Sequence, residues 1–131
     1  MIFDFRGKKI LIMGLGLHGG GVGTARFFVK RGARVTITDL RTEEQLRASM
    51  AKLKKYKDIA YVLGRHRKSD FLRADIIVKN PGVPPTSPYI ALARAHDIPI
   101  TTDVGIFLRQ CPALIIGVTG TRGKSTTCVL I

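Results

Sequence analysis

Residues 9–22 read KILIMGLGLHGGGV, a continuous apolar run followed by a cluster of glycines. A short apolar run that ends at a glycine is typical of a buried strand in a parallel sheet. After the glycines, apolar residues recur at helical spacing from Val22 to Val29, with a stop at Gly32. The stretch therefore predicts a strand, a glycine-rich turn and a helix, which together begin a βαβ unit.

The same alternation continues along the chain. Short apolar or β-branched runs predict further strands at 34–38, 60–63, 75–79, 98–101 and 113–118. Helices are predicted at 42–56, 86–95 and 103–109, and a last one begins near Gly123. Thr42 and Gln45 have the spacing of a capping box, and Pro99 indicates an edge strand or a strand start. This order predicts an α/β fold, a Rossmann-like parallel sheet with helices on both faces.

The first glycine loop has the pattern GxGxxG, from Gly14 to Gly19, directly after a predicted strand and before a predicted helix. Such a loop lets the backbone approach a phosphate, which the helix N-terminus then favours. Asp39 ends the second predicted strand, where a dinucleotide fold places the acid that binds ribose. Ligands of open α/β sheets bind beyond the carboxyl ends of the strands. We therefore expect the turns at 14–21, 39 and 80–82 to meet there.

A second glycine loop, GVTGTRGKST at 117–126, also follows a predicted strand and opens a helix. This is the context of a P-loop, in which backbone amides cradle phosphates. Lys124 would neutralise charge on the β- and γ-phosphates, and the hydroxyl of Ser125 would bind Mg²⁺. The strict P-loop has glycine where Val118 stands. The last helix stops at Ile131 with no cap and no strand after it, so we expect a truncated second α/β domain.

The form GxTGTxGKST at 117–126 resembles the P-loop of the Mur ligase family, and the departure at Val118 agrees with that family. The resemblance covers nearly the whole chain. It is closest to the D-glutamate-adding branch in four further segments, at 7–16, 31–41, 80–84 and 103–107. It implies a UDP-binding N-terminal domain at 1–111 and the start of an ATP-binding central domain at 112–131.

The resemblance implies an ATP-dependent, amide-forming ligase of peptidoglycan synthesis with ATP and Mg²⁺ as cofactors. Its substrates would be UDP-N-acetylmuramoyl-L-alanine and D-glutamate, and this piece alone would be inactive. The implied substrate-binding residues are Leu17, His18, Asp39, Leu40, Arg41, Asn80, Pro81 and Gly82. The implied ATP-binding residues are Gly120, Thr121, Arg122, Gly123, Lys124, Ser125 and Thr126, with Lys124 as the catalytic residue and Ser125 as the metal ligand. The family usually has serine at position 80 and asparagine at position 122.

Composition limits the classes of partner. The 131 residues are 45% apolar and carry a net charge of +13, and no apolar run approaches the roughly 20 residues of a membrane span. We expect a cytoplasmic monomer that binds neither membrane nor nucleic acid. The basic stretches at 52–57 and 65–68 are interpreted as a solvated helix face and a loop. Cys111 and Cys128 have no metal-site spacing and are expected to be small buried residues.

Three alternatives remain open at this point. An NAD-dependent oxidoreductase would use the first glycine loop and Asp39, but it has no need of the second loop. A basic module that only binds nucleotide or nucleic acid would explain the charge. Another Mur ligase, adding L-alanine or a diamino acid, would share both loops.

Overall fold

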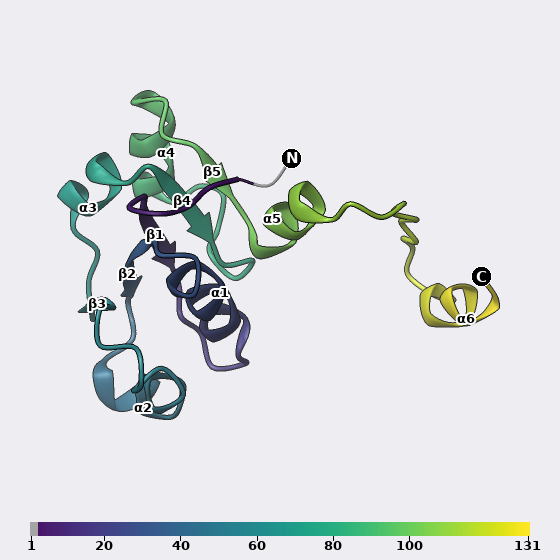
Figure 1. Ribbon diagram of the computed structural model, residues 1–131, viewed down its shortest axis with the longest axis horizontal. Helices are drawn as coiled ribbons and strands as arrows, with labels where there is room; N and C mark the ends of the chain where they lie inside the picture. The colour runs from purple at the N-terminus through teal and green to yellow at the C-terminus, as the bar shows by residue number, and fades with distance from the viewer. Residues whose placement is uncertain (1–2) are drawn as a thin grey trace.

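The computed structural model describes residues 3–131, and its centre is a five-stranded parallel sheet of order β3-β2-β1-β4-β5 (Figure 1). The strands are β1 (Lys9–Met13), β2 (Arg34–Asp39), β3 (Ala60–Leu63), β4 (Ile76–Lys79) and β5 (Ile100–Thr101). All four strand pairs are parallel, with Leu11 opposite Thr36 on one side of β1 and Ile77 on the other. The predicted Rossmann-like parallel sheet is confirmed, and the strand order reverses between β1 and β4.

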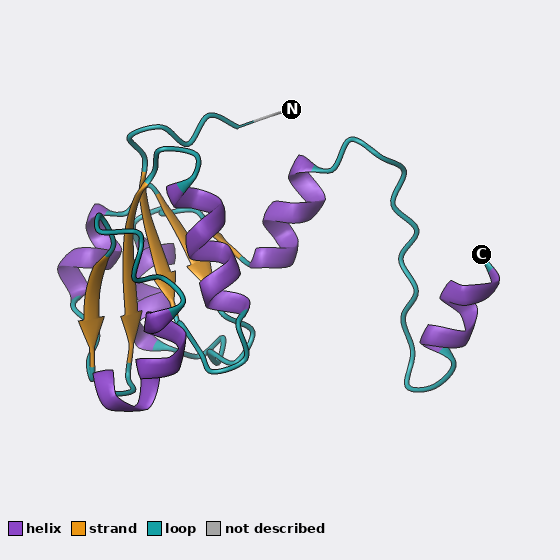
Figure 2. Ribbon diagram, turned by 60° about the horizontal axis from the view of Figure 1, so that its bottom comes forward, coloured by secondary structure: helices purple, strands orange, loops and turns teal. Residues whose placement is uncertain are grey.

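Helices cover both faces of the sheet (Figure 2). The helices of this body are α1 (Gly20–Val29), α2 (Glu43–Ala51), α3 (Lys68–Arg73), α4 (Pro88–Ala95) and α5 (Asp103–Gln110). Alternate residues of β1 explain the two layers, since Ile10 and Ile12 pack with α1 and α2, while Leu11 and Met13 pack with α3 and α4. A central strand that is buried on both faces must be apolar, and residues 10–13 of β1 are all apolar and buried.

Several boundaries differ from the sequence expectation. α2 begins at the predicted capping box, in which Thr42 and Gln45 bond reciprocally, but it ends at Ala51 and continues only as turns to residue 55. α3 was not predicted, because six residues are too few to show a clear helical period. β5 is shorter than expected, and it does form one edge of the sheet directly after Pro99.

The strand predicted at 113–118 is wrong. In the structure this segment leaves α5 in an extended path with no pairing, and it leads to α6 (Lys124–Leu130), which stands apart from the body (Figures 1 and 2). A strand requires a neighbour to accept its backbone hydrogen bonds, and the described chain offers none here. The buried state expected of Cys128 is also wrong, because this cysteine is exposed on α6, and Cys111 is only half-buried. Within residues 3–131, no helix has both the length and the apolar character needed to cross a membrane.

Candidate functional site

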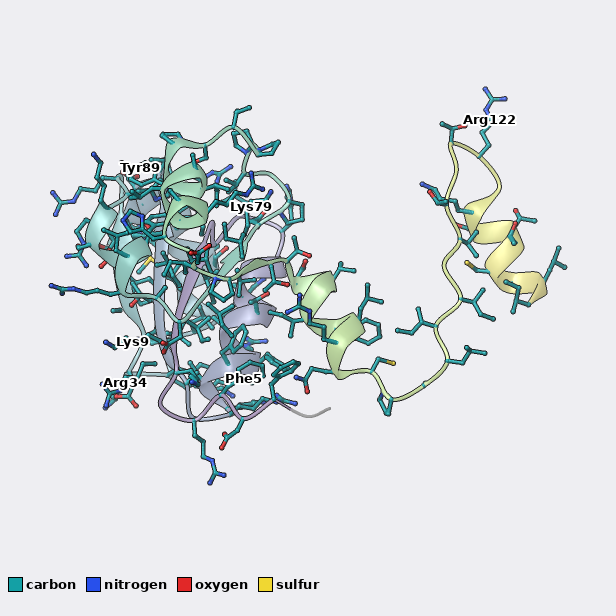
Figure 3. The ribbon with its side chains drawn as sticks, turned by 90° about the horizontal axis from the view of Figure 1, so that it is seen from above. Phe5, Lys9, Arg34, Lys79, Tyr89 and Arg122 are labelled. Atoms are coloured by element: carbon teal, nitrogen blue, oxygen red, sulfur yellow. The ribbon has the colours of Figure 1, made fainter. Side chains whose placement is uncertain are left out.

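The predicted meeting of three turns occurs at the carboxyl edge of the sheet. Lys79, the last residue of β4, lies at the opposite end of the sheet from Lys9 and Arg34, which begin β1 and β2 (Figure 3). A small pocket opens where the strand order reverses, and its lining includes Gly14, Asn80 and Asp103. This position is the one at which open α/β sheets bind ligands.

Asp39 is buried at the centre of this edge, with 3% of its surface exposed. Its Oδ2 accepts the amides of Leu15 at 2.9 Å and Gly16 at 3.2 Å. Its Oδ1 accepts the Arg41 amide at 2.9 Å and lies 3.4 Å from the Arg41 guanidinium. Several donors compensate the desolvation of this buried carboxylate. The carboxylate therefore fixes the glycine loop, and its contact with a nucleotide stays a prediction.

Asn80 ties the third turn to the first. Its Nδ2 donates to the carbonyl of Gly14 over 3.4 Å, and its Oδ1 accepts the amide of Gly82 over 3.0 Å. The backbones come so close that a Cβ at position 14 would lie 2.9 Å from the Asn80 Cβ, and Gly14 has φ +94°. Only glycine fits this conformation and contact. The side-chain amide of Asn80 therefore fixes the turn after β4 against the first glycine loop.

The remaining predicted residues surround this fixed centre and are open to solvent. Two apolar side chains stand out, since Leu17 is 52% exposed and Leu40 is 66% exposed. The other exposed members are His18, Arg41, Pro81 and Gly82. Exposed leucines and the cationic side chain of Arg41 suit a ligand with an apolar part and an anionic part.

Sequence reasoning missed three residues that shape the site. The Nζ of Lys79 donates to the carbonyl of Val83 over 2.7 Å and thereby fixes the turn after β4. Ser49 of α2 is buried and donates to the carbonyl of Gly16 over 2.8 Å.

His66 lies in the turn after β3, with its Nδ1 2.7 Å from the Thr38 hydroxyl. Residues 64–66 directly follow a predicted strand, and the carboxyl ends of parallel strands meet at one edge of the sheet. This position could have indicated that His66 lies near the site.

His66 is packed between Thr38 and the rings of Phe71 and Tyr89. Burial lowers the pKa of His66 below its ordinary value of 6.5, and the nearby Asp39 opposes this shift only in part. Loss of hydration disfavours the charged imidazolium, so the folded protein favours the neutral ring.

We expect this histidine to make the stability of the fold depend on pH. The unfolded chain takes up the proton at a higher pH than the folded chain, because the folded pKa is the lower one. The contribution of the neutral His66 ring to the free energy of unfolding is therefore fully present above about pH 6.5. It is lost as the pH falls below that value. Urea unfolding of the wild type and of His66→Gln at pH 7 and pH 5 measures this. The substitution should flatten the decline, and equal slopes would contradict the assignment.

The second glycine loop has only part of the expected geometry. Gly123 is the N-cap of α6 with φ +78°, and Gly120 has φ +145°, so both adopt backbone conformations that favour glycine. Lys124 and Ser125 occupy the first turn of the helix and are exposed. These two glycines and the adjoining cation and hydroxyl fit an ATP and Mg²⁺ cradle by residue type. The cradle itself is not formed by this arrangement and stays a prediction.

Comparison with known proteins finds a family model that covers the sheet and its turns. Residues 8–102 match the family model described as "Mur ligase MurD-like, N-terminal domain". The matched span contains β1 to β5 and all three turns of the carboxyl edge.

Individual relatives give the same picture. The chain is 54% identical over 125 residues to the UDP-N-acetylmuramoylalanine--D-glutamate ligase of Roseiflexus sp. (strain RS-1), covering 95% of this chain and 27% of the relative. The protein of that name from Borreliella burgdorferi (strain ZS7) is 46% identical and is covered to 28% of its length. The chain thus spans just over a quarter of these relatives.

Solved structures support the fold. A pseudomurein peptide ligase type C from Methanothermus fervidus aligns with a TM-score of 0.58 and 25% identity, over 92% of this chain and 24% of that chain. The precorrin-2 dehydrogenase SirC aligns with a TM-score of 0.57 at 13% identity, over 92% of this chain and 52% of that chain. The second likeness shows that the fold alone is shared with dehydrogenases and does not choose a ligand.

Proposed function

This chain belongs to the Mur ligase family through its MurD-like N-terminal domain, and from this premise we propose that it is the UDP-binding part of a D-glutamate-adding ligase. The parent enzyme would join D-glutamate to UDP-N-acetylmuramoyl-L-alanine in peptidoglycan synthesis. Residues 1–111 would bind the uridine nucleotide, and 112–131 would begin the ATP-binding domain. We further propose that the parent acts as a monomer in the cytoplasm.

The observation that carries this proposal is the junction of three turns at the point where the strand order reverses. The glycine loop is held by Asp39 and by Asn80, and the ring of exposed residues around it can contact a ligand. Leu17 and Leu40 offer apolar surface to the uracil ring, while Arg41 and the loop backbone face the anionic part. We propose that Asp39 serves the nucleotide chiefly by fixing Leu15 and Gly16, because its Oδ2 already accepts both of these amides.

A carboxylate is a poor electrophile until it carries a leaving group, and ATP supplies that group as phosphate when it is bound. In this chain, the backbone from Gly120 to Thr126 would hold the phosphates, and Ser125 would hold Mg²⁺. Lys124 would place a positive charge where phosphoryl charge develops. The presence of this second loop separates the proposal from a simple oxidoreductase domain.

We expect Lys124→Ala in the full-length parent to reduce turnover about 100-fold, because one cation would be lost from the developing negative charge. Release of ADP in the presence of ATP, Mg²⁺, UDP-N-acetylmuramoyl-L-alanine and D-glutamate measures this. Lys55→Ala is a matched control, since Lys55 is exposed in the turn after α2. The control should keep wild-type turnover. A Lys124 variant that works at the wild-type rate would remove this residue from the proposed machinery.

Titration calorimetry on the chain tests the proposal against its rivals. We expect UDP-N-acetylmuramoyl-L-alanine to bind and NADH not to bind. The reverse preference would indicate an oxidoreductase domain. A chain that does not bind UDP-N-acetylmuramoyl-L-alanine, but binds random DNA with an affinity that falls steeply as salt increases, would instead be a nucleic-acid-binding module.

A further inference from the structure

The backbone of the first glycine loop is held from three directions by three separate elements. Asp39, at the end of β2, accepts the amides of Leu15 and Gly16. Asn80, after β4, donates to the carbonyl of Gly14. The third contact comes from α2, where Ser49 Oγ donates to the carbonyl of Gly16 over 2.8 Å.

The side chain of Ser49 is buried and faces the glycine loop, not the solvent. Only 4% of its surface is exposed, and it lies on the face of α2 that also buries Leu46. A serine within a helix commonly bonds to a carbonyl of its own preceding turn. Here the hydroxyl instead reaches a carbonyl that is 33 residues away in the sequence. The bond therefore connects the position of α2 to the conformation of the loop.

The loop needs such a contact because Gly16 has φ +70° and no side chain to restrict it. A glycine peptide moves between several backbone conformations at little cost. With Asp39 on its amide and Ser49 on its carbonyl, Gly16 is bonded on both sides. The next residues, Leu17 and His18, extend from this fixed point into solvent.

We propose that Ser49 is a positioning residue of the nucleotide site, which sets where Leu17 and His18 meet the ligand by holding the carbonyl of Gly16. The proposal rests on the proposed function, because it assigns Ser49 to that same site. A loop held in its binding conformation has less conformational freedom to lose on binding. Without the hydroxyl, the loop would bind nucleotide more weakly even in a well-folded protein.

Hydrogen exchange tests the positioning without any ligand. In Ser49→Ala, the amides of Leu15 and Gly16 should exchange about tenfold faster than in the wild type. The amide of Ile77 in the central sheet should keep its rate. Ser69→Ala, on the exposed side of α3, is the matched control and should change none of these rates. Uniform acceleration of all amides, or no acceleration at the loop, would overturn the proposal.

Binding tests the consequence. Ser49→Ala should weaken the affinity of the chain for UDP about fivefold, while Ser49→Thr, which keeps the hydroxyl, should restore most of it. Wild-type affinity in both variants would refute the positioning role and leave the proposed function intact. A wild-type chain that binds no UDP would refute the proposed function, and the exchange rates would still decide whether Ser49 holds the loop.

Discussion

Gly21→Ala will lower the free energy of unfolding by at least about 3 kcal/mol. Gly21 is buried in the first turn of α1, and a Cβ built there would lie 2.2 Å from the carbonyl oxygen of Leu15. That distance is far inside van der Waals contact, so one of the two backbones must move. The loop resists such movement because the amide of Leu15 is bonded to the buried carboxylate of Asp39.

Gly23→Ala is the matched control in the same helix. A Cβ at position 23 meets nothing within 4 Å, and the residue is exposed. We expect this variant to be more stable than the wild type by about 0.5–1 kcal/mol, because alanine loses less backbone freedom in a helix than glycine. Urea unfolding measures both variants. Equal effects at the two positions would disprove the close approach of α1 to the loop.

Asp39→Asn will destabilise the chain by about 3 kcal/mol and abolish UDP binding. The substitution keeps the shape of the side chain but replaces one acceptor oxygen by an amide group. Both carboxylate oxygens face backbone N–H groups, those of Leu15 and Gly16 on one side and that of Arg41 on the other. Whichever way the new amide turns, it points hydrogens at a donor and leaves that donor unpaired in a buried place.

Asp75→Asn provides the comparison. This exposed carboxylate also accepts a backbone amide, that of Lys9 over 2.7 Å, but water can replace the bond. We expect a loss of no more than about 1 kcal/mol and unchanged affinity for UDP. If Asp39→Asn were tolerated as well as this control, the carboxylate could not be what fixes the glycine loop.

Much of the site could be predicted because it depends on strand ends. Asp39 and Asn80 each follow a short run that predicts a strand, and parallel strands bring their carboxyl ends to one edge. The roles of the two side chains could not be predicted, because their partners are backbone groups of a loop elsewhere in the sequence. Ser49 lies on the apolar side of α2 beside Leu46, which was a weak signal of burial. Nothing in that pattern indicates a bond to Gly16.

Local patterns along the chain were enough to predict β1 to β5, every helix except α3, their order and the parallel sheet, because apolar periodicity, caps and glycine turns act within a few neighbouring residues. The same patterns also placed the GxGxxG loop between β1 and α1. Three features follow from contacts made on folding: the donors that bond to the carboxylate of Asp39, the bond from Ser49 to Gly16, and the lack of a strand at 113–118. Each of these features requires a hydrogen-bond donor and an acceptor to be close in space. Their separation along the chain does not determine that distance.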